Sequence, residues 1–356
     1  MTEFLRRLPL NTETLVFGLL ILFLAIYPTF GTGFGVLNVA YFMSMIFLSI
    51  SVALIWGFAG ILSFGQTAFF GLAGYTFAVY TENNPGGWHS WIGVLVAVVA
   101  AALLAALLGY IMFYGGVNDV FVGLTMLAVT LVMATFMGQT AGPEWAIGIA
   151  RLNGYNGMFV NPITWPSGDW FTNEQVFCFF LILLVIVYIV LKILTSSRWG
   201  YGLIALRENR SRTETFGYNV QLLQVQVFTI SGAIAGLSGV LYASWGGYID
   251  PSSMGMTAAI TPVIYVAIGG RKSLAAAIIA SIALMKLIQE LSSTAPEYAF
   301  VITGAVALLA VVFMPDGIIY TLFRWVDEMV FRKLFLSNRQ VATESGDLGQ
   351  EGEKGV

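Results

Sequence analysis

Apolar residues occur in long blocks along this chain, and short polar segments separate the blocks. The hydrocarbon core of a bilayer is about 30 Å thick, which takes roughly 20 apolar residues in a helix. From Val16 through Thr81 there is no Asp, Glu, Lys, Arg or His, as expected in hydrocarbon, where a charge is costly. The pattern predicts an all-α integral membrane protein with about ten transmembrane helices. The predicted spans are residues 15–30, 38–56, 60–80, 91–114, 120–140, 176–195, 224–245, 257–270, 274–291 and 299–323.

Basic residues set the expected orientation. Of the 16 Lys and Arg, all but Arg151 and Lys286 fall in segments that share one side when the ten spans alternate. The acidic residues of the opposite side are Glu82, Glu144, Asp169, Glu174, Asp250 and Glu297. An excess of Lys and Arg marks the cytoplasmic side of a membrane protein. Both termini are therefore expected in the cytoplasm, which requires an even number of spans.

The chain divides into three parts. Residues 1–14 form a predicted cytoplasmic N-terminus, 15–323 the membrane domain and 324–356 a cytoplasmic tail. The first apolar block continues without a small-residue cleavage site, so an uncleaved first span is preferred over a signal peptide. The end of the tail is polar and lacks aromatic residues, a composition typical of disorder.

Composition narrows the classes of function. The 356 residues are 58% hydrophobic and only 10% charged, against about 25% charged residues in a soluble domain. A net charge of −3 gives no reason to expect a nucleic-acid partner. The single cysteine, Cys178, excludes an intramolecular disulfide and is expected to be buried among apolar residues. Together with the one histidine, His89, it is too little for a metal site.

The sequence offers no energy source of its own. Lys286 and Glu290 lie four residues apart inside one span, and we expect a local ion pair rather than a proton relay. An ion-coupled carrier needs more intramembrane charge than this. The segment "GGRKS" (269–273) lacks the spacing of a phosphate-binding loop. Energy for transport would therefore have to come from a separate subunit.

Two glycine-rich segments interrupt the apolar pattern. "GILSFGQTAFFGLAGY" (60–75) permits either close helix packing or a broken or re-entrant helix, and both interpretations stay open. Its polar side chains could line a path across the membrane; they are Ser63, Gln66, Thr67 and Tyr75. A second run, 231–255, carries Gly232, Gly236 and Gly239. Its loose similarity to the first hints that spans 2–5 are duplicated as spans 7–10.

Two connections are long. The outer loop, about 141–175, contains three Trp residues and is expected to form an ordered cap at the membrane interface; it is either a tolerated connection or a docking surface. In the inner loop, about 196–222, the residue pattern predicts a short helix that ends near Gly217. Its arginines either anchor the protein at the inner face or grip a groove on a partner protein.

Several motifs are similar to one family. "LIWGFAGILSFGQTAFFGLAGYTFAVY" (54–80) and "ALRENRSRTETFGYNV" (205–220) resemble the early block and the coupling loop of permease subunits of branched-chain amino acid and urea-type ABC importers. "LNGYNGM" (152–158), "GGYIDPSSMG" (246–255), "VAIGGRKSL" (266–274) and "FMPDGI" (313–318) resemble its later blocks in order. The resemblance covers about residues 35 to 320, and its details are closest to the urea and short-chain amide branch.

The resemblance implies a bacterial inner-membrane subunit that is not an enzyme. The expected partners are a second related permease subunit, favoured as a heterodimer, two cytoplasmic ATPases that bind the ATP, and a periplasmic substrate-binding protein. No cofactor is expected in this chain. The resemblance places the ATPase-coupling residues in the inner loop; they are Leu203, Leu206, Arg207, Glu208, Asn209, Arg210, Arg212 and Phe216. Gln66 stands where the family often has His, and Asp316 where it often has a basic residue.

The expected substrate is a small polar solute, with urea or a short-chain amide first and a branched-chain amino acid next. The uncharged candidate path suits a neutral solute, but a zwitterion could be held by helix termini. A stand-alone channel or facilitator is the alternative. An integral membrane enzyme is disfavoured, because the sequence lacks clustered His, Asp or Glu near the inner face.

Overall fold

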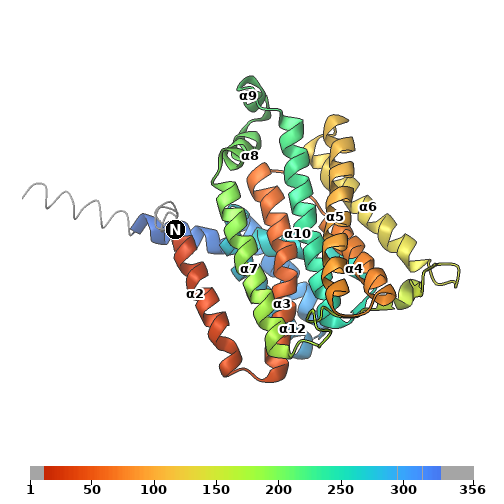
Figure 1. Ribbon diagram of the computed structural model, residues 1–356. Coiled ribbons are helices and arrows are strands. Elements are labelled where there is room, and N and C mark those ends of the chain that lie inside the picture. The colour runs from red at the N-terminus through yellow and green to blue at the C-terminus, as the bar shows by residue number, and fades with distance from the viewer. Residues whose placement is uncertain (1–11, 295, 315, 330–356) are drawn as a thin grey trace, which may run out of the picture.

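The computed structural model describes residues 12–294, 296–314 and 316–329 (Figure 1). Most of this part of the chain is helical, and its strands are two residues long. The helices are α2 (Thr12–Ile26), α3 (Gly33–Val52), α4 (Gln66–Asn83), α5 (Trp88–Tyr114), α6 (Asp119–Gly138), α7 (Asn173–Thr195), α8 (Arg198–Glu208), α9 (Arg210–Thr215), α10 (Val220–Gly246), α11 (Met256–Gly269), α12 (Leu274–Thr294) and α13 (Pro296–Phe313). A further helical stretch covers 318–329.

Helices occur at all ten predicted spans, and the all-α membrane fold is confirmed. Among the described residues, seven helical segments are long and apolar enough to cross a membrane. They are Thr12–Thr29, Gly33–Phe58, Trp88–Tyr114, Val120–Gly138, Asn173–Thr195, Val220–Gly246 and Leu274–Thr294. The other three predicted spans correspond to α4, α11 and α13. Helix α11 has 14 residues and is about 21 Å long, so it is too short to cross the hydrocarbon core alone.

Helix α10 lies at the centre of the bundle, between α3 on one side and α4 and α5 on the other (Figure 1). Three α10 side chains, seven residues apart, donate hydrogen bonds to α3 carbonyls that are also seven residues apart. The bonds run from Ser231 Oγ to the Ser51 carbonyl (2.8 Å), from Ser238 Oγ to that of Ser44 (2.6 Å) and from Trp245 Nε1 to that of Leu37 (2.8 Å). This spacing fixes the antiparallel register of the two helices, because seven residues is close to two helical turns.

Removing the two serine donors should destabilise the bundle. We expect Ser231→Ala and Ser238→Ala each to cost about 0.6–1.7 kcal/mol, the range for interhelical hydrogen bonds in membranes. A lowered Tm in detergent, measured by intrinsic fluorescence, checks this. Ser293→Ala is the matched control, because the Ser293 hydroxyl is exposed and donates only within its own helix, to the Glu290 carbonyl. An equal fall in Tm for Ser293→Ala would show that the loss of the interhelical hydrogen bonds is not the cause.

Glycines on α10 allow this close packing. A Cβ at Gly232 would lie 2.4 Å from the Ala105 Cβ on α5, and one at Gly239 would lie 2.0 Å from the Phe70 carbonyl oxygen on α4. Neither neighbour is the end of a flexible side chain, so larger residues at these two positions would push the helices apart. The second glycine-rich segment therefore acts in helix packing, as small residues commonly do in membrane bundles.

Both glycine-rich segments also border breaks in helical structure, so the broken-helix interpretation left open for residues 60–75 holds beside close packing. Helix α3 continues as a π-helix (η2, Ala53–Phe58), and residues 60–65 then run without helix to the start of α4. Gly60 begins this break with φ +79°, a conformation that favours glycine. On the other side of the bundle, α10 ends at Gly246, and a short strand (β4, Tyr248–Ile249) and a 3-10 turn (η4, Pro251–Met254) lead to α11.

The outer loop is the ordered cap that the sequence predicts. It contains the strands β1 (Ala146–Ile147), β2 (Ala150–Arg151) and β3 (Met158–Phe159) and the 3-10 turn η3 (Gly154–Asn156). Strands β1 and β2 pair with each other, and β3 pairs with β4, which precedes α11. The cap is also tied to α5, because Trp91 Nε1 donates a hydrogen bond to the Thr164 carbonyl (2.9 Å).

The described ends of the chain lie on the same face as the connection between α7 and α10. Glu13, at the start of α2, forms an ion pair with Lys192 at the end of α7 (2.5 Å). Thr12 donates its backbone N–H to the Asp327 carboxylate (3.1 Å), which agrees with an even number of spans. Most of the predicted terminal segments, 1–14 and 324–356, lie outside the described residues.

One burial prediction is wrong. Cys178 is exposed on α7, although it lies in an apolar run. Burial in a soluble core is the usual fate of such a cysteine, but the outer faces of membrane helices are themselves apolar and exposed to lipid.

Candidate functional site

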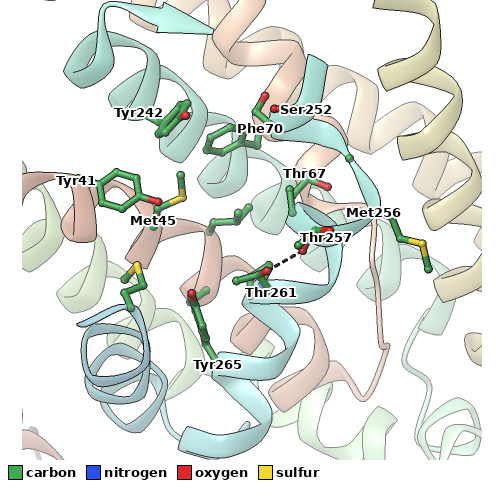
Figure 2. A pocket seen from close by; sticks show the side chains of 17 residues that line it. Tyr41, Met45, Thr67, Phe70, Tyr242, Ser252, Met256, Thr257, Thr261 and Tyr265 are labelled. Carbon is green, nitrogen blue, oxygen red and sulfur yellow. Dashed lines mark hydrogen bonds between the residues drawn. The ribbon is translucent and has the colours of Figure 1, made fainter. Parts of the chain in front are cut away.

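A cavity of about 530 Å³ opens within the bundle where the broken segments meet (Figure 2). Its walls come from α3, α4, α10, η4, α11 and α12. The lining residues are Tyr41, Met45, Leu48, Ser49, Thr67, Phe70, Tyr242, Ser252, Ser253, Gly255, Met256, Thr257, Ala258, Thr261, Pro262, Tyr265 and Met285. Irregular backbone survives at membrane depth only where protein covers it or a cavity admits water. The position of η4 and the start of α11 beside this cavity satisfies that condition.

The cavity lining is polar but uncharged. Hydroxyl groups from Ser, Thr and Tyr alternate with Met, Leu and Phe side chains, and no Asp, Glu, Lys, Arg or His is among them. The hydroxyls of Ser49 and Thr67 are fully buried and have no hydrogen-bond partner among the described residues. A buried hydroxyl without a partner is costly, and both of these lie in the wall of the cavity.

The start of α11 adds backbone donors to the same cavity. Gly255 precedes the helix and provides no side-chain cap, and Gly255, Met256, Thr257 and Ala258 all line the cavity. The first N–H groups of a helix have no partner within it, and they carry the positive end of the helix dipole. Figure 2 shows Thr257 and Thr261 on this helix opposite Thr67. The arrangement can bind a carbonyl or carboxylate oxygen without any charged side chain.

The four predicted path residues occupy different places. Thr67 lines the cavity. Gln66, next to it, is buried, and neither its amide oxygen nor its nitrogen has a partner among the described residues. The Ser63 hydroxyl accepts a hydrogen bond from Gly65 N (3.2 Å) and so shapes the break. Tyr75 lines a second cavity, of about 520 Å³, between α4, α5, α6 and the outer cap.

Sequence reasoning missed most of the cavity. The residues that it did not single out include Tyr41, Ser49, Tyr242, Thr257, Thr261 and Tyr265. A signal was available in α11, where two threonines four residues apart precede a proline inside the helix, Pro262. Polar residues on one face of a short, proline-containing apolar helix are typical of a helix that borders a path.

The predicted coupling loop forms two helices that meet at Asn209, and we call residues 196–222 the elbow. Asn209 caps α9, because its side chain accepts a hydrogen bond from Arg212 N (2.9 Å). Helix α9 ends at Thr215, two residues before Gly217 (φ +85°), near the position that the sequence predicts for the end of a helix. Helices α8 and α9 project from the bundle at one end of α7 and α10 (Figure 1), where they are accessible to a partner.

The elbow residues divide into buried and accessible groups. Leu203 and Leu206 are 0% and 4% exposed, so they hold α8 on the bundle. Glu208, Arg212 and Phe216 are exposed, with Phe216 at 78%, and Arg210 is partly exposed and forms an ion pair with Glu214 (3.4 Å). Arg207 instead points into the bundle, where its Nη1 donates a hydrogen bond to the Gly57 carbonyl (2.6 Å).

Charged groups cluster beside the elbow, at the connection between α11 and α12. The Arg271 guanidinium lies over the Trp56 ring, 5.4 Å from its centroid. Lys272 forms an ion pair with Asp316 (2.7 Å). The hydrogen bond from Lys272 holds the pKa of the Asp316 carboxyl below its usual range, and the positive charges of Lys272, Arg324 and Arg271 add to this effect. The ion pair fastens the segment after α13 to this connection.

At the opposite face, the expected local ion pair on α12 is present. Lys286 Nζ lies 2.6 Å from Glu290, and both side chains are more than half exposed. Across the described residues, no group of three or more His, Cys, Asp or Glu is placed to hold a metal ion.

A bundle of apolar helices with broken segments around an uncharged cavity defines a polytopic membrane transport protein. Residues 35–311 match the family model described as the permease component of the branched-chain amino acid transport system. This chain therefore belongs to that permease family, and it is a multi-pass inner-membrane protein. The resemblance drawn from its motifs is confirmed at the level of the family.

The relatives include two kinds of permease subunit. The chain is 26% identical to the high-affinity branched-chain amino acid transport system permease protein LivM of Escherichia coli K12, over 84% of this chain and 73% of that protein. It is 24% identical to a probable LivM of Methanocaldococcus jannaschii, over 76% and 89% of the two chains. It is 21% identical to LivH of Salmonella typhimurium, over 76% and 90%. No solved structure matches the chain significantly.

Proposed function

We propose that this chain is a membrane-spanning subunit of an ATP-driven ABC importer, and that a small solute crosses through the uncharged cavity. The cavity carries the proposal, because it brings buried hydroxyls without partners and the uncapped start of α11 together at membrane depth. The chain has no phosphate-binding loop, so the energy is supplied by ATP bound to partner subunits, and no cofactor is assigned to this chain.

The proposed assembly has four kinds of subunit. A second, related permease pairs with this chain, and the similarity to both LivM and LivH proteins supports a heterodimer. Of the two ATPases, one binds the elbow of this chain through its accessible residues, Arg210, Arg212 and Phe216. A periplasmic binding protein delivers the solute to the outer cap.

For the solute, we propose a branched-chain amino acid first and urea or a short-chain amide second. The names of the relatives favour the amino acid, which reverses the order expected from the sequence motifs. The cavity suits it: Leu48, Phe70 and Met285 offer an apolar wall for the side chain, and the start of α11 offers N–H groups for the carboxylate. The amide remains the second candidate because the lining carries no charged partner for an ammonium group.

Reconstitution tests this function. The chain, its partner permease and the ATPases are placed in proteoliposomes with the binding protein, and uptake of labelled leucine is compared with that of urea and acetamide. We expect leucine uptake that requires both ATP and the binding protein. Solute flux through this chain alone, without ATP, would instead establish the channel alternative. ATP-dependent uptake of urea or acetamide but not of leucine would reverse the proposed order of solutes.

A further inference from the structure

The guanidinium of Arg207 joins a backbone carbonyl inside the bundle to the exposed carboxylate of Glu208. Its Nη1 donates to the Gly57 carbonyl (2.6 Å), while its Nε and Nη2 donate to Glu208 Oε1 (3.1 and 2.7 Å). The side chain is 19% exposed. Arg210, three residues later, is 36% exposed and has one ion pair, to Glu214. Arg207 is thus placed to act on the bundle, whereas Arg210 is placed to act on a partner.

The Gly57 carbonyl, which accepts the hydrogen bond from Arg207 Nη1, lies in a π-helix close to the end of helical structure. Gly57 belongs to the π-helix that continues α3, and the chain leaves helical structure a few residues later. The last carbonyls of a helix need donors from outside it, and Arg207 supplies one. The stem of Arg207 also covers the start of the break, since a Cβ on Gly60 would lie 2.8 Å from the Arg207 Cγ. Short π-helical segments within α-helices occur frequently at functional sites.

The same π-helix contacts the end of α11. A Cβ on Gly57 would lie 1.7 Å from the Arg271 carbonyl oxygen, so the two backbones are in direct contact. Trp56 stacks with the Arg271 guanidinium. On its other face, therefore, the π-helix touches the connection that follows α11. Arg207, the π-helix and Arg271 form a continuous series of contacts from the elbow into the bundle.

The segments that Arg207 and Arg271 join each continue into a wall of the cavity. Leu48 and Ser49 line the cavity on α3, eight to nine residues before Gly57, and Tyr265 lines it on α11, six residues before Arg271. Thr67 lines it on α4, seven residues after Gly60. At about 1.5 Å per helical residue, the walls on α3 and α11 lie roughly 9–14 Å from the contacts of Arg207 and Arg271.

We propose that Arg207 is a positioning residue that transmits movement of the elbow to the cavity walls, rather than a residue that binds the ATPase. A displaced elbow pulls the Gly57 carbonyl through the short charged hydrogen bond. The π-helix moves with it, and the backbone contact passes the displacement to Arg271 and α11. This inference rests on the proposed function, because it assumes that an ATPase moves the elbow.

The test compares arginine substitutions within the elbow of the full reconstituted complex. For Arg207→Ala we expect the ATPases to co-purify at the wild-type level and to hydrolyse ATP, while solute uptake falls at least about tenfold. Arg207→Lys keeps one charged donor for Gly57 and should have intermediate uptake. In the control, Arg210→Ala combined with Arg212→Ala, uptake should fall together with the amount of ATPase recovered.

Two results would overturn the proposal. One is loss of ATPase co-purification by both Arg207→Ala and Arg207→Lys at normal membrane yield, because Arg207 would then be a contact residue. The other is uptake by Arg207→Ala equal to that of the wild type. If Arg207→Ala does not accumulate in the membrane, the comparison of Arg207→Lys with the control decides between the two roles. A wild-type complex without ATP-dependent uptake would reject the importer function itself, independently of the elbow variants.

Discussion

A tryptophan at Thr261 is expected to stop solute uptake and to leave the assembled complex intact. Thr261 lines the cavity on α11 (Figure 2), and its hydroxyl donates only to the Thr257 carbonyl one turn earlier (2.7 Å). The indole would extend into the cavity and not into packed core, so the fold is preserved. A steric barrier of about 3 kcal/mol along the path would slow uptake roughly a hundredfold. Initial uptake rates in proteoliposomes, normalised to the amount of complex, measure this.

Two control variants separate blockage from other effects. Thr261→Val removes the hydroxyl at nearly constant volume and should retain most of the uptake. Leu308→Trp places the same large side chain on α13, where Leu308 is 65% exposed, and should have no effect. Normal uptake by Thr261→Trp would show that the solute does not pass through this cavity.

Changing Phe216 to aspartate should separate the ATPases from the membrane subunits. Phe216 is 78% exposed at the end of α9, the most accessible large apolar side chain of the elbow. An aromatic residue buried at an interface commonly contributes 2 kcal/mol or more, so its loss should weaken binding about thirtyfold. Co-purification of the ATPase with tagged Phe216→Asp, at equal membrane yield, measures the effect.

The matched control lies on the opposite face of the protein. Phe159, on β3 of the outer cap, is 79% exposed, so Phe159→Asp makes the same chemical change at equal accessibility. It should leave ATPase recovery unchanged. If both variants recover the ATPase normally, the partner does not bind the elbow through Phe216, and the proposed docking residues are wrong.

The sequence predicts the positions of the membrane helices well, because the cost of placing charge in hydrocarbon leaves a strong pattern. For residues 60–75 it also indicates a broken helix as one of two interpretations, since glycine-rich apolar segments are poor helices. The sequence does not predict which helices pack against one another. The serines at 231 and 238 resemble any small residues in a membrane helix, and only the folded bundle brings them to the carbonyls of α3.

The cavity could be predicted only in part for the same reason. Thr67 stood out because it lies in a polar, glycine-rich segment, and Tyr75, from that same segment, lines a different cavity two helical turns away. Tyr41 and Tyr265 come from separate helices, and the residues directly before and after each of them are apolar. In the elbow, the spacing of Leu203 and Leu206 is the one-sided pattern of a helix packed on a surface, so their burial was predictable from periodicity, whereas the inward direction of Arg207 was not.

The three hydrogen bonds between α3 and α10 also limit how this protein can change shape. A slip of one residue, about 1.5 Å along the axis, would misalign all three donors together. The two helices are therefore expected to move as one rigid body. The last bond is accepted by Ser51, and the π-helix begins two residues later, at Ala53. The π-helix lies beyond the last of these three bonds, so they do not limit its movement, and it is the part that Arg207 and Arg271 contact.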